Sequence, residues 1–213
     1  MSAQRQLQTW TEEEYWAMEE KSPVKHEFIN GQPFEMSGGT YNHTTICTNL
    51  ASSAKAHLRG KPCRARSSEQ KVKSEKSGNT FYPDAVIFCP PARFVGKGDH
   101  TLCTPAVIFE VLSPSTAALD RGDKFTAYRQ IETLTDYILI EPERVFVDHY
   151  RRTPAGWLLN NYTRRADVLP FPDLDIELPL DELYDELDVP EALLLLLSPQ
   201  MSDDEDDEDD DET

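Results

Sequence analysis

The stretch Tyr82-Pro83-Asp84-Ala85-Val86-Ile87-Phe88 is followed along the chain by a second apolar run, Val107-Ile108-Phe109-Glu110-Val111-Leu112. Both runs are rich in β-branched and aromatic residues, which predicts two buried strands. Each strand carries one carboxylate, Asp84 or Glu110, and a buried carboxylate costs free energy unless it has a partner. Because one cation can serve both groups, the two strands predict half of a divalent-metal site.

The two carboxylates also indicate the kind of ion and the kind of chemistry. Carboxylates on neighbouring strands suit Mg²⁺ or Mn²⁺, which prefer oxygen ligands and keep several bound waters. Hydrolysis of a phosphodiester needs a nucleophilic water, a Lewis acid that offsets the charge developing on phosphate, and often a cation beside that water. Asp84 and Glu110 would be the metal ligands, and a lysine would complete such a site.

The candidate lysine lies in the helix predicted after the second strand. Ser113-Pro114-Ser115-Thr116 ends that strand and offers N-cap hydroxyls for a helix that reaches about Ile131. Spacings of four and three residues put Lys124 on the face of Tyr128 and Ile131, which should pack on the sheet. Arg121 lies one turn earlier on the same stripe.

Two of the candidate residues have simpler interpretations. Lys124 could pair with Asp120 at i, i+4 on a solvated helix face, a contact worth about 0.3 kcal/mol. His43 stands near the start of a predicted helix and could approach the metal site. A lone histidine at a helix start is more often a capping or surface residue, however, and we interpret His43 in that way.

The N-terminal half predicts two helices and several short strands. A capping box at Thr11 predicts a helix of about ten residues. An Asn-Gly turn predicts a hairpin over residues 25–34, on which Glu27 is the first strand-borne carboxylate. Apolar residues at four-residue spacing, ended by a glycine cap, predict a helix over residues 41–59. Short strands are expected at residues 62–66 and 70–73.

The C-terminal half predicts a loop, a meander and a last helix. A loop of about 14 residues begins at Pro90 and exceeds the usual length of a connection, which suggests a mobile flap. Strands over residues 136–140, 145–150 and 157–162, separated by turns, predict an antiparallel meander. Leucines at helical spacing predict a helix over residues 179–187.

Charge is distributed unevenly along the 213 residues, whose formal net charge is −18. From Asp173 onward the chain holds 19 of its 39 acidic residues and no Lys or Arg, so 20 acidic and 21 basic residues precede it. Residues 1–172 are therefore nearly neutral, and we expect a folded domain over residues 1–187, a short apolar segment over 188–201, and a disordered acidic tail over 202–213.

The cysteines and the apolar runs bear on the cellular compartment. Cys47, Cys63, Cys89 and Cys103 show no C-x-x-C pair and no histidine at zinc spacing, so we expect reduced thiols. The N-terminal residues lack the apolar core of a signal peptide, and the longest apolar run is far shorter than a membrane span. A soluble, cytoplasmic protein without a membrane partner is the expectation.

Residues 59–76 form the most basic stretch of the chain, with seven Lys and Arg residues. One interpretation is a solvated face of a sheet. The other is a surface that contacts the phosphates of a nucleic acid. The sequence does not decide between them.

Three motifs together resemble the signature of the bacterial Uma family. They are Tyr82-Pro83-Asp84, the run Ile108-Phe109-Glu110-Val111-Leu112-Ser113-Pro114-Ser115-Thr116, and Asp120-Arg121-Gly122-Asp123-Lys124-Phe125-Thr126-Ala127-Tyr128. The resemblance covers about Thr9 to Leu180. This family is assigned to the restriction-endonuclease-like PD-(D/E)XK superfamily, so the resemblance implies an α/β fold with a central mixed β-sheet flanked by helices.

The resemblance also implies roles for individual residues. Asp84 matches the motif aspartate and Glu110 the motif acid, while Glu27 resembles an additional acid that many members carry on their first core element. The motif lysine should follow Glu110 by two residues, where this chain has Leu112. The resemblance therefore implies that Lys124, on the following helix, takes the place of the motif lysine.

The function implied is that of a metal-dependent endonuclease that cleaves DNA. Mg²⁺ or Mn²⁺ would be held by Glu27, Asp84 and Glu110. Lys124 would stabilise the developing anion or the attacking hydroxide, and Arg121 would be available for a phosphate. A homodimer is compatible with the resemblance. Two alternatives remain: a nucleic-acid-binding module of the same fold without cleavage, and an interaction protein whose acidic tail occupies a basic groove.

Overall fold

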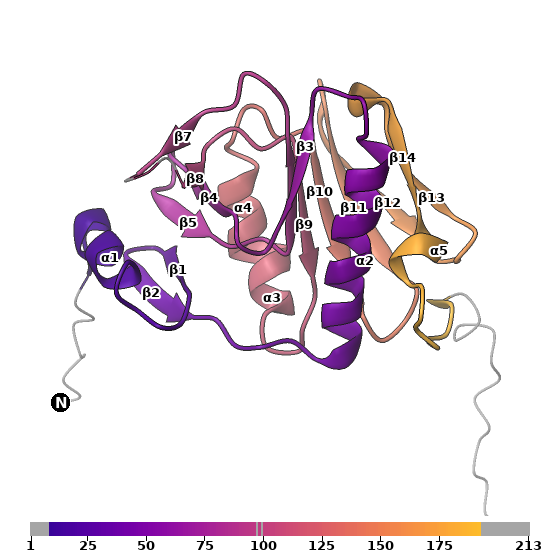
Figure 1. Cartoon of the computed structure of the whole chain (residues 1–213), viewed down its shortest axis with the longest axis horizontal. Coiled ribbons are helices and arrows are strands. Elements are labelled where there is room, and N and C mark those ends of the chain that lie inside the picture. Colours follow the sequence, from indigo (N-terminus) through magenta and orange to yellow (C-terminus); the bar gives the residue numbers. More distant parts are fainter. Residues whose placement is uncertain (1–8, 97, 99, 193–213) are drawn as a thin grey trace, which may run out of the picture.

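Three layers make up the protein in its computed structural model, which describes residues 9–96, 98 and 100–192 (Figure 1). A six-stranded central sheet forms the middle layer. One helix, α2, and a C-terminal hairpin cover one of its faces, and a second six-stranded sheet with a short helix covers the other. The expected α/β class with a mixed sheet between helices is confirmed.

The central sheet has the strand order β12-β11-β10-β9-β6-β3. β9 and β10 run parallel and all other neighbours are antiparallel, so the sheet is mixed. The strands are β3 (Arg64–Ser67), β6 (Ala85–Phe88), β9 (Val107–Val111), β10 (Asp136–Ile140), β11 (Val147–Thr153) and β12 (Gly156–Tyr162). The last three form the predicted antiparallel meander.

The second sheet has the order β2-β1-β5-β4-β8-β7 and contains only short strands. They are β1 (His26–Ile29), β2 (Gln32–Glu35), β4 (Lys71–Ser74), β5 (Asn79–Phe81), β7 (Phe94–Val95) and β8 (Thr101–Leu102). β1 and β2 form the predicted hairpin, whose turn residues Asn30 and Gly31 both have positive φ, as an Asn-Gly turn between two strands requires.

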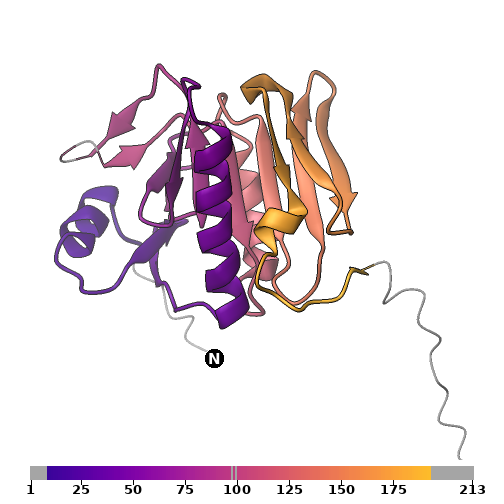
Figure 2. The same ribbon diagram turned by 45° about the vertical axis from the view of Figure 1, so that its right-hand side comes forward.

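One face of the central sheet packs on α2 (Tyr41–His57), the hairpin of β13 (Val168–Phe171) and β14 (Ile176–Pro179), and α5 (Leu180–Leu183). In Figure 2, α2 and this hairpin lie side by side in front of the sheet. The apolar stripe of α2 that predicted the helix is buried here: Ile46, Leu50, Ala54 and Leu58.

The opposite face packs on the second sheet and on α4 (Phe125–Tyr128). Ile108 and Leu139 of the central sheet share this core with Val72 and Phe81 of the second sheet. Tyr128 lies in the same core, so the helical segment that carries Lys124 is enclosed between the two sheets. The N-terminal helix α1 (Glu12–Glu19) begins at the predicted capping box on Thr11.

Two predicted segments are organised differently in the structure. The strand predicted to run from the Asn79 turn through Asp84 is divided, because β5 joins the second sheet and β6 the central sheet. Tyr82, Pro83 and Asp84 connect the two. The expected loop after Pro90 contains β7 and β8, which pair at the edge of the second sheet.

The helix predicted from residue 116 to 131 is interrupted. α3 (Ala117–Leu119) is followed by one π-helical turn, η1 (Asp120–Lys124), and then by α4. A π-helical turn takes an additional residue, which rotates the side chains that follow it, and such turns occur frequently at functional sites. The hydroxyl of Tyr137 on β10 donates to the carbonyl oxygen of Asp120 at 2.9 Å and holds this turn.

The C-terminal part departs most from expectation. The helix predicted over residues 179–187 is the four-residue α5, and the β13–β14 hairpin before it was not predicted. The short 3-10 helix η2 (Pro172–Leu174) turns that hairpin. The acidic tail from residue 202, and residues 193–201 of the apolar segment before it, lie outside the described residues. Within the described part of the chain, no helix combines the length and apolarity needed to cross a membrane.

The prediction that all four cysteines are reduced is wrong for Cys63 and Cys89, which form a disulfide. Because Arg64 pairs with Phe88 in the register of β3 and β6, Cys63 and Cys89 are the next opposed pair, with 4.1 Å between their Cα atoms. The two cysteines are 26 residues apart in the sequence, so the sequence alone does not show that they are close in the fold. Cys47 and Cys103 are free.

This pairing leads to a simple test. Thiol titration of the unfolded, unreduced protein should count two free thiols, and a reducing agent should lower the free energy of unfolding by about 2–4 kcal/mol. A count of four thiols in protein prepared without reductant would contradict the disulfide.

Candidate active site

Asp84 and Glu110 lie opposite each other on neighbouring strands. In the antiparallel pairing of β6 and β9, Ala85 faces Phe109, and the same register extended by one residue places Asp84 against Glu110. Opposed residues of an antiparallel pair bring their Cβ atoms within about 4.5–5.5 Å. The structure therefore brings the two predicted acids together from positions 26 residues apart in the sequence.

Asp84 lies just before β6, and its side chain supplies an acceptor to the neighbouring strand. The Oδ2 atom of Asp84 accepts a hydrogen bond from the backbone N–H of Val111 at 2.8 Å. The side chain of Asp84 remains 15% exposed. Asp84 is therefore more exposed than Glu27, Glu110 and Lys124.

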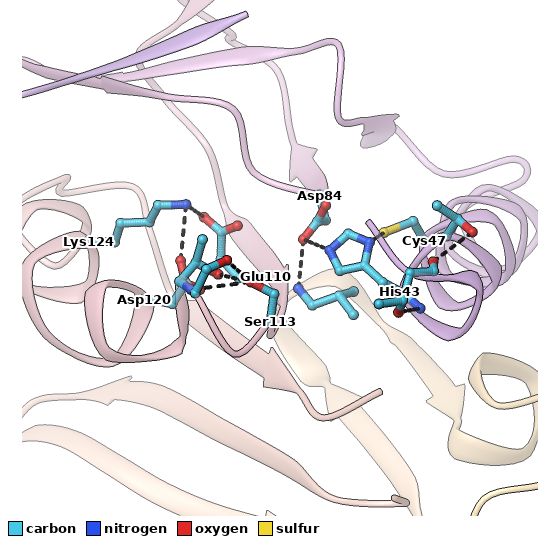
Figure 3. A network of polar contacts seen from close by, with 12 residues as sticks. His43, Cys47, Asp84, Glu110, Ser113, Asp120 and Lys124 are labelled. Carbon is cyan, nitrogen blue, oxygen red and sulfur yellow. Dashed lines mark hydrogen bonds and ion pairs between the residues drawn. The ribbon is translucent and has the colours of Figure 1, made fainter. Parts of the chain in front are cut away.

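Lys124 lies in the middle of three carboxylates, of which Figure 3 shows those of Glu110 and Asp120. Its Nζ atom is 3.0 Å from Oε1 of Glu27, 3.0 Å from Oδ1 of Asp120 and 3.4 Å from Oε1 of Glu110. The side chain of Lys124 is only 5% exposed. The pair with Asp120 that the sequence suggested thus exists, but it is buried and shared with two further acids.

Burial and charge act in opposite directions on this lysine. Burial lowers the pKa of Lys124, but the carboxylates of Glu110, Glu27 and Asp120 outweigh it and hold the pKa well above its ordinary value. Lys124 therefore carries a positive charge at neutral pH. An ammonium enclosed in this way is a fixed charge rather than a mobile surface group.

Glu110 is the acid most affected by its surroundings. Burial raises the pKa of Glu110 well above its usual range; Lys124 opposes this rise, while Asp120, Asp84 and Glu27 add to it. The hydroxyl of Tyr128 donates to Oε1 of Glu110 at 3.1 Å. A carboxyl whose charge is disfavoured by burial and by like charges is typical of functional sites, and a bound cation would favour its ionised form.

Glu27 reaches the cluster from the second sheet. Its Oε1 atom accepts from the backbone N–H of Tyr82 at 3.2 Å, in the segment that leads to Asp84. It also contacts Lys124. The structure therefore brings Glu27, Glu110 and Lys124 into direct contact, and it places Asp84 next to them, opposite Glu110 in the strand register.

Arg121, the fifth candidate, lies elsewhere. Its guanidinium donates to Oε1 of Glu141 at 3.0 Å and to Oδ2 of Asp148 at 3.1 Å. The π-helical turn directs Lys124 and Asp120 into the core, while Arg121 remains about one-third exposed. A phosphate contact by Arg121 stays a prediction.

The interpretation of His43 as a capping or surface residue is wrong. Thr40 supplies the N-cap of α2, and the Nε2 atom of His43 lies 3.5 Å from Oδ2 of Asp84. The Sγ atom of Cys47 lies 3.5 Å from Nδ1 of the same ring. The i, i+4 spacing of His43 and Cys47 was visible in the sequence, but which face of α2 meets Asp84 was not.

The basic stretch over residues 59–76 has two parts. Lys61, Lys73 and Lys76 pair with carboxylates on other elements. Others line an open groove of about 740 Å³ between the end of α2 and β3: Arg59, Arg64 and Arg66, together with Lys55. A phosphate-contacting surface on this stretch stays a prediction.

A mixed central sheet with opposed acids at the end of two strands, and a buried lysine beside them, defines a nuclease-like α/β fold. A crystal structure described as a putative nuclease belonging to DUF820, from Anabaena variabilis ATCC 29413, superimposes on this fold with a TM-score of 0.64. The match covers 81% of this chain and 96% of that chain at 16% identity.

The chain belongs to the Uma2 family, whose model, described as "Putative restriction endonuclease", matches residues 12–181. Two relatives come from Synechocystis sp. The uncharacterized protein slr1290 is 35% identical over 173 residues, covering 81% of this chain and 90% of the relative. The uncharacterized protein sll1609 is 31% identical over 150 residues, covering 70% and 85%.

Proposed function

We propose that this protein is a metal-dependent endonuclease that hydrolyses phosphodiester bonds of DNA. The observation that carries the proposal is the position of Lys124, whose ammonium lies 3.4 Å from Glu110 and joins the acids of both sheets. The motif position on the strand is the buried Leu112, so Lys124 provides from the helix the charge that the strand lacks.

The residues present fit a divalent ion with oxygen ligands. Three carboxylates, those of Glu27, Glu110 and Asp120, contact the single ammonium of Lys124, and the charge of Asp84 acts on Glu110 as well, which leaves an excess of negative charge. A divalent cation would offset that excess. Asp84 and Glu110 would hold Mg²⁺ or Mn²⁺, with Glu27 as a further ligand.

A bound Mg²⁺ would supply Lewis acidity toward the phosphate and favour ionisation of a water. The protein's own side chains supply a fixed positive charge and orient the metal ligands. Lys124 offers a fixed positive charge toward the developing anion, and a charge held before the reaction costs no reorganisation. Asp120 positions Lys124, and the Tyr128 hydroxyl orients the Glu110 carboxylate.

Solvent reaches this group at one edge. The side chains of Glu27, Glu110 and Lys124 are at most 7% exposed, whereas those of Asp84 and His43 are 15% and 17% exposed. The scissile phosphate would therefore approach at the Asp84 edge, beside the start of α2. Glu27, Glu110 and Lys124 would lie deeper in the protein than the bound phosphate.

An incubation of purified protein with supercoiled plasmid and with single-stranded DNA tests the proposal. We expect strand breaks with Mg²⁺ or Mn²⁺ and none with EDTA. Asp84→Asn, purified identically, should be inactive, which excludes a contaminating nuclease. Asp123→Asn, an exposed neighbour of Lys124, should cleave as the wild type does.

Two outcomes would count against the enzyme. Binding of DNA without cleavage under every metal condition would favour the alternative of an inactive nucleic-acid-binding module. Equal cleavage by the wild type and Asp84→Asn would show that Asp84 is not part of the active site.

A further inference from the structure

His43 and Cys47 lie beside the acid cluster and take no part in the proposed cleavage. They stand one turn apart on α2, and their side chains point toward Asp84 (Figure 3). One ligand atom from each of the three residues can be chosen such that all three atoms lie within 4.8 Å of one another. Neither an imidazole nor a thiol is a ligand that Mg²⁺ prefers.

The three side chains can meet at one ion once the imidazole turns, because Cys47 and Asp84 contact different nitrogens of the His43 ring. In a tetrahedral zinc site with bonds of about 2.0–2.3 Å, neighbouring ligand atoms lie about 3.3–3.8 Å apart. Here the Cys47 sulfur is 3.5 Å from Nδ1 of His43, and Nε2 of His43 is 3.5 Å from Oδ2 of Asp84. The terminal torsion of a histidine is broad, so a turn of the ring can direct one nitrogen between the other two ligands.

The same three residues could instead serve a catalytic role in which Cys47 acts as a nucleophile. Burial raises the pKa of the Cys47 thiol well above its ordinary value, and Asp84 raises it further. The thiolate that attack would require is therefore disfavoured, since reactive cysteines lie where positive charge lowers the pKa. A cation that replaces the thiol proton removes this obstacle, because a metal-bound thiol is deprotonated.

We propose that His43, Cys47 and Asp84 form a binding site for a thiophilic divalent transition-metal ion such as Zn²⁺. Imidazole, thiolate and carboxylate are all zinc ligands, and three protein ligands leave the fourth position to water. Binding transfers the proton of the Cys47 thiol to solvent. Because Asp84 belongs to both sites, this ion withdraws it from Mg²⁺ and inhibits DNA cleavage, a consequence that rests on the proposed function.

Co²⁺ binding tests this site without an activity assay, because a cysteine thiolate bound to Co²⁺ gives a charge-transfer band in the near ultraviolet. We expect the band at one equivalent in the wild type, its loss on addition of Zn²⁺, and no change on addition of Mg²⁺. Cys47→Ser should lack the band, and His43→Gln should bind Co²⁺ at least about tenfold more weakly.

Cys103→Ser is the matched control, because Cys103 is the other free cysteine and lies in a different core region. Its band should equal that of the wild type. A band that persists in Cys47→Ser, a band lost in Cys103→Ser, or no band at a large excess of Co²⁺ overturns the proposal.

A second measurement uses only the wild type, in case a variant fails to fold. Zn²⁺ should protect Cys47 from alkylation, as read by peptide mass spectrometry, while Mg²⁺ should not. Equal alkylation of Cys47 with and without Zn²⁺ overturns the site. Neither readout involves DNA, so the two proposals can fail separately. Co²⁺ binding without DNA cleavage would refute only the proposed nuclease activity. DNA cleavage without the Co²⁺ charge-transfer band would refute only this metal site.

Discussion

Replacing Glu110 with Gln should lower the rate of DNA cleavage by about 10³-fold or more and leave the metal-free protein as stable as the wild type or more stable. Glu110 is fully enclosed, and burial together with the neighbouring acids raises its pKa. A neutral amide of the same shape removes this unfavourable charge and can still accept from the Tyr128 hydroxyl. Lys124 keeps Glu27 and Asp120 as partners.

Calorimetry in EDTA and in Mg²⁺ separates the two effects. The wild type should unfold at a higher temperature with Mg²⁺ than with EDTA, while Glu110→Gln should show no such difference. Glu177→Gln, at an exposed position on β14, is the matched control and should behave as the wild type. Clear destabilisation of Glu110→Gln in EDTA would mean that the carboxylate is a structural group and that the site is wrongly assigned.

Replacing Lys124 with Met should destabilise the protein by about 3–5 kcal/mol, since it leaves three buried carboxylates without their cation. Met keeps the length and apolar stem of the side chain, so the loss reports the charge rather than a cavity. Under conditions in which the variant is folded, cleavage should be slower by about 10²–10³-fold. Urea unfolding and single-turnover cleavage measure the two quantities.

Lys76→Met provides the comparison for stability. Lys76 also pairs with a glutamate, Glu132, but the two side chains are 61% and 83% exposed, so its loss should lower the stability far less than the loss of Lys124. The double variant Lys124→Met/Glu110→Gln should recover part of the stability that Lys124→Met loses, because one uncompensated charge is removed. Equal stabilities for Lys124→Met and Lys76→Met would place Lys124 on a solvated face.

The strands and the acids of the site could be predicted because their patterns are local. Each of Asp84 and Glu110 interrupts an apolar run, and the helical stripe of Tyr128 and Ile131 indicated that Lys124 faces inward. The structure buries Lys124 and both of these apolar residues. The grouping of these residues is observed, while their catalytic roles stay predictions.

Other features could not be predicted because they depend on the relation between distant segments. The π-helical turn separates Arg121 from Lys124, although both lie on one stripe of a regular helix. Cys63 meets Cys89 only once β3 and β6 pair. Likewise, the strands of the second sheet are only two to four residues long. Segments this short do not show enough alternation of apolar and polar residues to be recognised as strands rather than turns.

The three residues that join the two sheets have a further consequence. Tyr82, Pro83 and Asp84 lead from β5 in the second sheet to β6 in the central sheet, and the group around Lys124 draws Glu27 from the second sheet and Glu110 from the central sheet. Neither sheet alone holds a complete set of reactive groups. Under the proposed function, a chain that is still being synthesised, or one whose second sheet has come loose, would therefore be harmless to the DNA around it, and cutting would begin only when folding is complete.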